Sequence, residues 1–492
     1  MAALALPSPV LGGDWPDPSL VFDNGEHVAV TTSGGWAPSM RVLRSPDLKQ
    51  WRITGAVFRE PPRWAAGFFW APEITRLGSG FAVYYSALPR TSKTIYCLGV
   101  ATAPTPEGPW RDHGRPLRCG PDGSIDPFPV RDERGGLHLL WKSNGNRFGH
   151  RTPIYAQRLS EDGLRLSGPL RELIRNDRPW EKRVVEAPAV IRAGDGFFYL
   201  FYSGAQCCAR PCDYGVGVAR STRLLGPWRK YPGNPILRSG NGWRCPGHTE
   251  IADDGAGNLT AVFHAYRGGN GFMAGRQLLA APLTFGAGGW PRIGDGRPPA
   301  PVPGAAPTGF SDDFAGPLAP EWEWPLNRAP AIGTGSSGLL LRAPLRERDG
   351  DDAGRKLDAG LIARRTGTHR YTAFAVVDRA ALRGKAAGGL ASYKNSKLAI
   401  GIATDRGRVV VWQRDYRGRV LAEASAPASP LVYLRMVARG RSFSFAVSPD
   451  GVAWKPFGRA FRSPVKETAR VALTAGGERR AQVRFASAML AE

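Results

Sequence analysis

The 492-residue sequence has no apolar run approaching the roughly 18 residues that cross a membrane as a helix. Methionine (5) and cysteine (6) are scarce, and acidic residues (42) are outnumbered by basic ones (66). The first 13 residues, MAALALPSPVLGG, lack a basic segment ahead of their apolar stretch, so we predict no signal peptide there. Glycine (62) and proline (43) are abundant but follow no collagen-like period. Membrane-helix and fibrous classes are therefore excluded, and the length predicts two or more globular domains.

The net charge of +24 suggests a partner of opposite charge, and nucleic acid is the first class to consider. The basic residues are spread over both halves of the chain. The densest pairs, Arg364-Arg365 and Arg479-Arg480, are not interleaved with aromatic residues. A nucleic-acid binder usually concentrates its charge on one face or stripe. We therefore predict no nucleic-acid partner, and we interpret the charge as solvated surface or as weak attraction to acidic polysaccharide.

All six cysteines lie in the first half of the chain: Cys97, Cys119, Cys207, Cys208, Cys212 and Cys245. The last four could be combined with His248 into a zinc site, but the spacing lacks the paired Cys-x-x-Cys segments typical of such sites. We favour disulfides or inert thiols, with the pairing left open.

Short β-like runs such as 81–85, 137–141 and 197–202 dominate, and no long segment has a convincing 3.6-residue period. Two series of motifs recur every 53 to 64 residues. The first is a turn leading to an aromatic or apolar residue: Ser45-Pro-Asp-Leu48 with Trp51, Gly108-Pro-Trp110, Gly168-Pro-Leu170, Gly226-Pro-Trp228 and Gly289-Trp290. The second carries an acid: Asp17-Pro-Ser19, Ala71-Pro-Glu73, Asp126-Pro-Phe128, Glu186-Ala-Pro188 and His248-Thr-Glu250. Five such units, of about four strands each, predict the blades of a β-propeller.

In a propeller the innermost strands line a central channel, so equivalent repeat positions converge on the axis. We therefore expect Asp17, Asp126 and Glu186 to face one cavity. Carboxylates that share a cavity repel each other, so one can hold a proton while another stays ionised. That division supplies the acid and the base for hydrolysis of a glycosidic bond. An Asp before Pro is often only a turn former, but the shared repeat position favours the catalytic interpretation.

The motifs with the most specific order and spacing are Trp15-Pro-Asp-Pro-Ser19, Ser45-Pro-Asp-Leu48 through Trp51, Trp70-Ala-Pro-Glu73, Ser124-Ile-Asp-Pro127, Val185-Glu-Ala-Pro188 and Pro246-Gly-His-Thr249. With them, residues 12–290 resemble the family 43 glycoside hydrolases, five-bladed β-propellers that act on arabinose- and xylose-containing polysaccharides. The resemblance implies that Asp17 is the general base that activates water, that Asp126 orients the acid and tunes its pKa, and that Glu186 protonates the leaving group. It also implies inversion of the anomeric configuration. Ala187 stands where many relatives have glycine.

The same resemblance implies substrate-binding roles for His248, Arg267, Trp36 and Trp70. His248 matches a histidine deep in the channel that sometimes contacts a bound calcium, and a satisfied buried histidine is the alternative. Arg267 is placed like an arginine that contacts the terminal sugar, with a surface ion pair as its alternative. Trp36 and Trp70 offer flat apolar faces for a pentose, with core packing as the alternative, and we favour the sugar contact more for Trp70. We expect that no cofactor is required; the resemblance allows a structural Ca²⁺ in the propeller channel, at His248.

Residues 291–309 are dense in Pro, Gly and Ala and are predicted to link a propeller at 1–290 to a second domain at 310–492. Alternating runs at 371–377, 409–412, 433–437 and 443–447 predict antiparallel strands of a β-sandwich. Three further segments resemble the concanavalin-like (jelly-roll) module that follows some family 43 domains: 310–314 with Trp322, 388–390 with Tyr393, and 448–454. We expect this domain to support the propeller or to contact carbohydrate.

The predicted fold is therefore all-β, a five-bladed β-propeller followed by a β-sandwich. The predicted activity is an inverting, exo-acting glycosidase that releases terminal α-L-arabinofuranose or β-D-xylose from hemicellulose or pectin oligosaccharides. The segments Asp14-Trp-Pro-Asp-Pro-Ser19 and Phe68-Phe-Trp-Ala-Pro-Glu73 resemble the arabinofuranosidases of the family more closely, so we favour arabinofuranose, whereas the appended sandwich favours xylose. A non-catalytic carbohydrate-binding propeller and a polyanion-binding protein are the alternatives. We expect a saccharide partner and no membrane partner, favour a secreted or periplasmic location over the cytoplasm, and leave the oligomeric state open.

Overall fold

The computed structural model describes residues 6–208, 211–254, 257–302, 309–344 and 356–492. Residues 1–5 of the N-terminal segment and 303–308 of the predicted linker lie outside that description. Two units are distinguished: the first contains Met1–Leu11, Trp15–Gly268 and Arg276–Ala305, and the second contains Gly12–Asp14, Gly269–Gly275 and Ala306–Glu492. Within the described residues, no helix is long and apolar enough to cross a membrane.

The first unit contains five antiparallel sheets formed by consecutive strands. Blade 1 contains β1 (Ser19–Asp23), β2 (Glu26–Val30), β4 (Ser39–Ser45) and β5 (Arg52–Phe58), with the short β3 (Trp36–Ala37) between β2 and β4 in sequence. Blade 2 contains β6 (Ala65–Leu77), β7 (Gly80–Pro89) and β8 (Cys97–Ala103), and both β9 (Arg111–Asp112) and β10 (Arg118–Cys119) pair with β8. Blade 3 contains β11 (Ser124–Arg131), β12 (Leu137–Ser143), β13 (Ile154–Leu159) and β14 (Leu166–Ile174).

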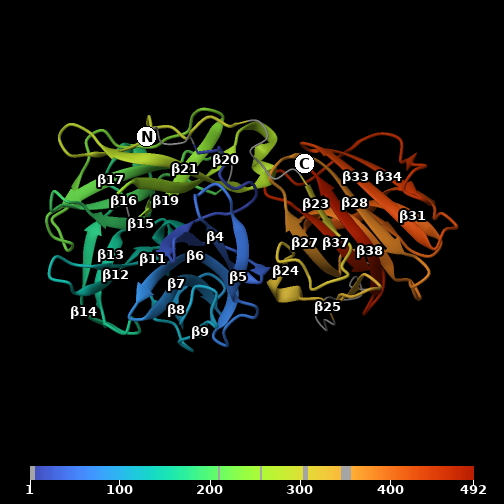
Figure 1. The fold of residues 1–492 in the computed structure, drawn as a ribbon, viewed down its shortest axis with the longest axis horizontal. Helices are drawn as coiled ribbons and strands as arrows, with labels where there is room; N and C mark the ends of the chain where they lie inside the picture. Colours follow the sequence, from blue (N-terminus) through green and yellow to red (C-terminus); the bar gives the residue numbers. More distant parts are fainter. Residues whose placement is uncertain (1–5, 209–210, 255–256, 303–308, 345–355) are drawn as a thin grey trace. The chain divides into compact units, whose positions relative to one another are not determined.

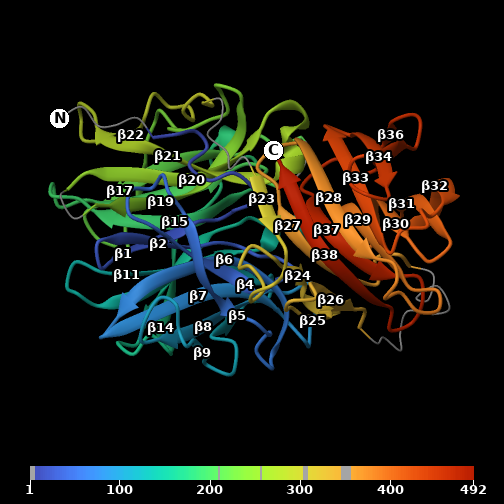
Figure 2. The same ribbon diagram turned by 45° about the vertical axis from the view of Figure 1, so that its right-hand side comes forward.

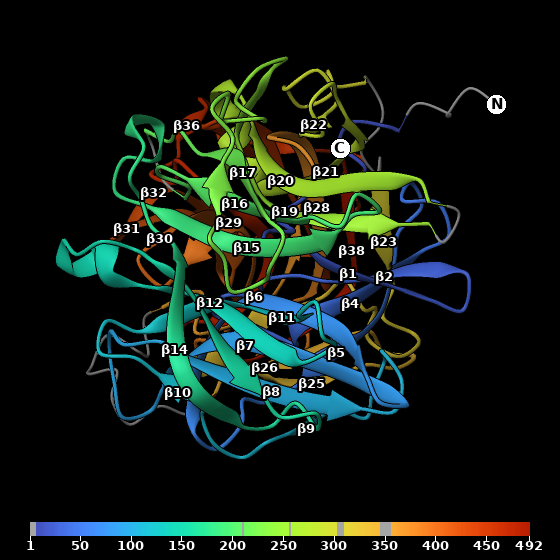
Figure 3. The same ribbon diagram turned by 90° about the vertical axis from the view of Figure 1, so that its left-hand side faces the viewer.

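The last two blades follow the same pattern (Figure 3). Blade 4 contains β15 (Val185–Arg192), β16 (Phe198–Gly204), β17 (Gly215–Ser221) and β18 (Arg229–Lys230). Blade 5 contains β19 (Trp243–Asp253), β20 (Leu259–Arg267), β21 (Arg276–Phe285) and β22 (Pro291–Ile293). Short 3₁₀ turns occur at η1 (Gly145–Phe148), η2 (Pro179–Glu181), η3 (Gly269–Ala274) and η4 (Leu326–Arg328).

The first strands of the five blades form a closed ring (Figure 1). β1 contacts β6, β6 contacts β11, β11 contacts β15, β15 contacts β19, and β19 contacts β1 again. Apolar clusters fill the spaces between blades; one joins Tyr84 and Leu98 of blade 2 to Leu139 and Trp141 of blade 3. This arrangement confirms the predicted five-bladed propeller.

Tryptophans of the first motif series stand directly before the outer strands β5, β9 and β18. The indole N–H groups of Trp51, Trp110 and Trp228 donate to backbone carbonyl oxygens of the preceding turn at 3.2, 3.1 and 2.9 Å. In blade 3 the corresponding Gly168-Pro-Leu170 lies inside β14 instead. The series therefore marks the start of the outer strand in four of the blades, since Trp290 likewise precedes β22 of blade 5, and in three of them the indole closes the preceding turn.

The second unit consists mainly of two antiparallel sheets (Figure 2). One sheet contains β23 (Gly309–Asp312), β25 (Ala331–Gly333), β26 (Leu339–Arg342), β28 (Arg370–Asp378), β33 (Leu431–Arg439), β34 (Ser442–Ser448), β35 (Lys455–Pro456), β36 (Phe461–Arg462) and β38 (Gln482–Ala491). The other contains β27 (Gly360–Arg365), β29 (Ala387–Asn395), β30 (Leu398–Thr404), β31 (Arg408–Asp415), β32 (Arg417–Ser425) and β37 (Arg470–Gly476); β24 (Trp324–Pro325) precedes them. The predicted sandwich is confirmed, and its four predicted strands fall in β28, β31, β33 and β34.

The predicted linker overlaps structured chain at both ends. Pro291–Ile293 form β22, which pairs with β21 as the outer strand of blade 5, and β23 begins at Gly309. Proline is tolerated as the first residue of an edge strand, because its missing N–H removes no ladder bond there. The Pro-rich composition therefore does not exclude a strand at this position.

Candidate active site

A left-handed residue recurs in, or just before, each blade's innermost strand. The φ angle is 55° at Asp17, 43° at Ala71, 57° at Asp126, 54° at Ala187 and 50° at His248. The strand pairing shifts register around this position in β6, β11, β15 and β19. Such β-bulges are common beside active sites, since they redirect a side chain without ending the sheet. Each blade thus has one residue whose left-handed backbone changes the direction of its side chain relative to the innermost strand.

The acids of the second motif series do not all occupy that position. Asp17 and Asp126 are themselves the left-handed residues, whereas Glu186 comes one residue before its bulge position. Glu73 and Glu250 come two residues after theirs. The expectation of one shared repeat position was therefore wrong for Glu186, because a motif series aligned on acids alone does not reveal the bulge.

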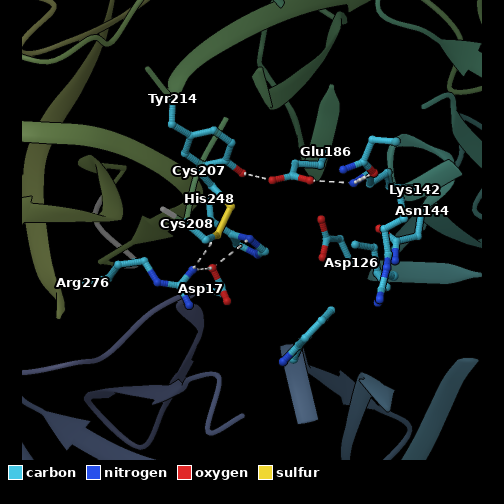
Figure 4. Close-up of a pocket in the computed structure, with 14 residues that line it drawn as sticks. Asp17, Asp126, Lys142, Asn144, Glu186, Cys207, Cys208, Tyr214, His248 and Arg276 are labelled. Atoms are coloured by element: carbon cyan, nitrogen blue, oxygen red, sulfur yellow. Dashed lines mark hydrogen bonds and ion pairs between the residues drawn. A yellow bond between two sulfur atoms is a disulfide. The ribbon is translucent and has the colours of Figure 1, made fainter. Parts of the chain in front are cut away.

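A cavity of about 430 Å³ is lined by side chains from all five blades (Figure 4). Its lining includes five residues proposed from the sequence: Asp17, Trp70, Asp126, Glu186 and His248. Its lining also includes residues that the sequence analysis missed: Ile125, Lys142, Asn144, Asn146, Arg147, Cys207, Cys208, Tyr214 and Arg276. The volume is within the range of small-ligand sites.

Asp17 is surrounded by cationic and imidazole nitrogens. Nη1 of Arg276 donates to Oδ1 at 2.9 Å, and the Nδ1 atoms of His248 and His264 lie 3.4 and 3.3 Å from the same oxygen. Burial alone would raise the pKa of Asp17, but the charge of Arg276 and the contact with His248 hold it well below its usual value. Asp17 is therefore an ionised carboxylate at neutral pH.

His264 supports Asp17 from a fully buried position in β20. The backbone N–H of Asp17 donates to Nδ1 of His264 at 3.1 Å, so this nitrogen acts as the acceptor of a neutral ring. Burial lowers the pKa of His264 to about 4, although the Asp17 carboxylate opposes the shift. The residue therefore positions the backbone of Asp17 without carrying charge at neutral pH.

Glu186 accepts hydrogen bonds on both carboxylate oxygens. Nζ of the buried Lys142, on β12, donates to Oε2 at 2.7 Å, and the Tyr214 hydroxyl donates to Oε1 at 2.8 Å. Lys142 also donates to Oδ1 of Asn146 at 3.0 Å. Side chains from blades 3 and 4 thus fix the orientation of the Glu186 carboxylate toward the cavity (Figure 4).

Asp126 is linked to the Glu186 segment through the backbone. Its Oδ2 accepts the N–H of Ala187 at 3.0 Å, and its own N–H donates to Oγ of Ser86 at 3.1 Å. Burial raises the pKa of Asp126 to about 6; His248 and Lys142 oppose the shift, and the Glu186 and Asp17 carboxylates add to it. Asp126 therefore holds a proton more readily than an ordinary aspartate.

Of the three predicted sugar contacts Trp36, Trp70 and Arg267, the structure places only Trp70 in the lining of the cavity. Trp70 lines the cavity and stacks on Tyr96 with ring centres 3.9 Å apart and planes 18° apart. Trp36 and Arg267 are not among the described residues that line the cavity. Trp36 is buried, and the Arg267 guanidinium lies 5.4 Å from the centre of the Trp243 ring. Arg276, the first residue of the neighbouring strand, reaches the cavity.

The surroundings of His248 do not fit a calcium ion. Calcium prefers six to eight oxygen ligands. Here the carboxylate in contact with His248, that of Asp17, already accepts from the Arg276 guanidinium, and the neighbouring His264 offers a nitrogen instead of an oxygen. The described residues contain no cluster of three or more His, Cys, Asp or Glu side chains arranged to hold a metal. No step of the chemistry is derived through a metal.

Comparison with known proteins agrees with this geometry. Residues 6–291 match the glycosyl hydrolases family 43, and residues 311–475 match the "Beta xylosidase C-terminal Concanavalin A-like domain". The chain is 26% identical over 291 residues to the extracellular exo-α-(1→5)-L-arabinofuranosidase ArbA of Cellvibrio japonicus, covering 52% of this chain and 80% of ArbA. It is 25% identical over 502 residues to a putative β-xylosidase of Escherichia coli, covering 92% of this chain and 90% of that protein.

Among solved structures, the Bacteroides ovatus protein described as "Xyloglucan PUL GH43B" is similar in fold. Its TM-score is 0.81 at 19% sequence identity, and the match covers 99% of each chain. The family match spans more than half of the sequence and includes the strands that carry all three carboxylates. The chain therefore belongs to family 43 of the glycosyl hydrolases, and it is a glycoside hydrolase.

Proposed function

We propose that the enzyme is an inverting, exo-acting glycosidase that releases terminal α-L-arabinofuranose or β-D-xylose from hemicellulose or pectin oligosaccharides. The observation that carries the proposal is the electrostatic difference between carboxyl groups in one cavity. Asp17 is held ionised by Arg276, whereas Asp126 has a pKa raised to about 6 beside Glu186. Acid–base hydrolysis needs an ionised base, which Asp17 supplies, and the raised pKa of Asp126 keeps a proton close to Glu186, the proposed acid.

In the proposed reaction, Asp17 accepts a proton from a water molecule as the water oxygen bonds to the anomeric carbon. The bond from that carbon to the glycosidic oxygen breaks, and Glu186 gives a proton to the departing oxygen. Exchange with solvent then returns a proton to Glu186 and removes one from Asp17. Asp126 acts as a positioning residue, because it holds the N–H of Ala187 next to Glu186.

Two sugars remain in the proposal, and each has its own support. The similarity to ArbA, whose name specifies exo-acting arabinofuranosidase activity, covers the propeller and favours α-L-arabinofuranose. The match of residues 311–475 to a β-xylosidase C-terminal domain, together with the full-length similarity to a putative β-xylosidase, favours β-D-xylose. Trp70, backed by Tyr96, offers an aromatic face for either ring.

A secreted or periplasmic location is part of the proposal. The structure pairs Cys97 with Cys119, Cys207 with Cys208, and Cys212 with Cys245. Disulfides persist in oxidising compartments. ArbA, one of the relatives, is named as an extracellular enzyme.

The test is hydrolysis of 4-nitrophenyl α-L-arabinofuranoside and β-D-xyloside, with the first-formed anomer followed by proton NMR. We expect cleavage of at least one substrate with inverted configuration, and a loss of about 10²- to 10⁴-fold in kcat for Glu186→Gln. A product of retained configuration would contradict the mechanism. If neither pentoside were cleaved, saccharide binding without turnover would support a carbohydrate-binding propeller instead, and strongly salt-dependent heparin retention alone would support a polyanion binder.

A further inference from the structure

Two adjacent cysteines form part of the cavity wall. Cys207 and Cys208 lie in the loop between β16 and β17 and are joined to each other by a disulfide, with Cα atoms 3.7 Å apart. Both line the same cavity as Asp17, Glu186 and His248. In an antiparallel blade the innermost strand begins at the cavity face and the second strand returns to it. The loop that follows the second strand therefore lies at that face (Figure 4).

The loop is anchored on both sides of the cysteine pair. The backbone N–H of Gln206 donates to Oδ1 of Asp213 at 2.9 Å, and the N–H of Asp213 donates to the carbonyl of Gln206 at 3.1 Å. Beyond it, Cys212 is joined by a disulfide to Cys245 on the innermost strand of blade 5. The cysteine pair is thus held against the cavity by contacts independent of its own bond.

The pair also lies against the group that controls the base. Nη1 of Arg276 lies 3.7 Å from Sγ of Cys208 and donates to Oδ1 of Asp17 at 2.9 Å. A disulfide has no polar hydrogen, and its sulfur atoms are only weak hydrogen-bond acceptors. It therefore presents an apolar surface to the cavity beside the Arg276 guanidinium that binds the base.

We propose that the Cys207–Cys208 disulfide is a substrate-binding element that packs against the C–H face of the terminal sugar. Hydroxyl groups of the sugar are then directed to the polar side chains, while the sulfurs contact the ring carbons and exclude water beside Arg276. This inference rests on the proposed glycosidase function and adds to it a determinant of affinity that lies outside the acid–base residues.

The test compares two double variants, Cys207→Ala/Cys208→Ala and Cys207→Ser/Cys208→Ser, with the wild type on the pentoside that the enzyme cleaves. We expect KM to rise about three- to tenfold, as loss of a small apolar contact predicts, with kcat within about twofold. The Ser variant should be affected more than the Ala variant, because hydroxyl groups hold water where the sugar carbons bind. Cys97→Ser/Cys119→Ser is the matched control, since it removes a blade 2 disulfide whose cysteines are not among the described residues lining the cavity.

Unchanged KM in both double variants would overturn the proposal, and so would a loss confined to kcat, which indicates an effect through Arg276 alone. Mass mapping without reductant should find the Cys207–Cys208 peptide lighter by two hydrogens, and free thiols at both positions would also overturn it. If the wild type cleaved no pentoside, the proposed function would be refuted, but the proposed disulfide contact would not yet be tested. Binding of L-arabinose and D-xylose, followed by tryptophan fluorescence, would then decide: equal Kd values in wild type and variants would refute the disulfide contact.

Discussion

Arg276 and Asp17 are joined by a 2.9 Å hydrogen bond although they lie at opposite ends of the propeller sequence. Arg276 begins β21 of blade 5, and Asp17 precedes β1 of blade 1. The two meet because β19 contacts β1 and closes the ring of blades. The ionised state of the proposed base therefore depends on closure of the propeller, and it does not exist in an isolated first blade.

Replacing Arg276 by glutamine should move the acidic limb of the pH profile. Burial raises the pKa of Asp17, and the charge of Arg276 is the strongest of the effects that lower it. Without that charge the pKa of Asp17 rises, so activity is lost at a higher pH as the solution is acidified. The measurement is kcat/KM against pH, which reports ionisations of the free enzyme.

Arg276→Lys is the matched control, because it keeps a positive charge near Asp17. Its acidic limb should lie between those of the wild type and Arg276→Gln. An acidic limb at the same pH in all three enzymes would show that Asp17 is not the group that titrates.

The proposed acid and base should respond differently to the leaving group. Glu186→Gln removes the proton that the departing oxygen receives, so the loss should be large for an oligosaccharide and small for a 2,4-dinitrophenyl glycoside, which leaves readily without protonation. Asp17→Asn removes the base and should reduce activity on both substrates by similar factors. The ratios of kcat/KM on the two substrates measure this difference, and equal ratios for the two variants would exclude the assigned roles.

Lys142 and Glu186 should be coupled in stability. Nζ of Lys142 is buried and donates to Oε2 of Glu186 at 2.7 Å, so Lys142→Met leaves that oxygen without its hydrogen-bond donor. Removing one member of a buried pair costs about 3 kcal/mol, whereas removing both costs much less. The free energies of unfolding of the two single variants and of Lys142→Met/Glu186→Gln form a double-mutant cycle. Additive losses would refute the coupling.

Glu250 should make the protein less stable as pH rises. Burial raises the pKa of Glu250 to about 8 from an ordinary value of 4.5, so the folded protein keeps a proton that the unfolded chain releases. By linkage, stability is greatest below about pH 4.5, falls between that pH and about 8, and then levels. Glu250→Gln removes this decline and can still accept the Ile251 N–H that Glu250 accepts at 2.9 Å.

The measurement is Tm at pH 5 and pH 8, and the gain of Glu250→Gln over the wild type should be larger at pH 8. Glu73→Gln should behave alike, because burial and the charge of Glu250 raise the pKa of Glu73 well above its usual value. A Tm difference that is the same at both pH values would contradict the buried, protonated state.

The fold was largely predictable because its signals are local and repeated. Trp51, Trp110 and Trp228 mark turns whose indole hydrogen bonds recur in three blades, and alternating runs gave the sandwich strands. The bulge was not predictable, because a left-handed Asp17 or Ala187 has no characteristic residue type. Alignment of the motifs therefore matched Glu186 to the left-handed position, which is in fact the next residue, Ala187. Glu186 nevertheless lines the cavity.

The site was predictable where it lies on innermost strands and not elsewhere. Asp17, Asp126 and Glu186 belong to the repeated segments, whereas Lys142 comes from a second strand and Arg276 from a third. Cys208 comes from the loop between the second and third strands of blade 4. Such contributions depend on how neighbouring strands place side chains in space, and no repeat or motif marks them in the sequence.

The left-handed bulge has a consequence for where the innermost strands can direct a side chain. All five blades already adopt the conformation, yet Ala71 and Ala187 carry only methyl groups where Asp17, Asp126 and His248 carry reactive ones. The backbone therefore adopts the same left-handed conformation at Ala71 and Ala187 as at Asp17, Asp126 and His248. A polar residue introduced at Ala71 or Ala187 would show whether this backbone conformation alone is enough to direct a side chain toward the cavity that Asp17, Asp126 and His248 line.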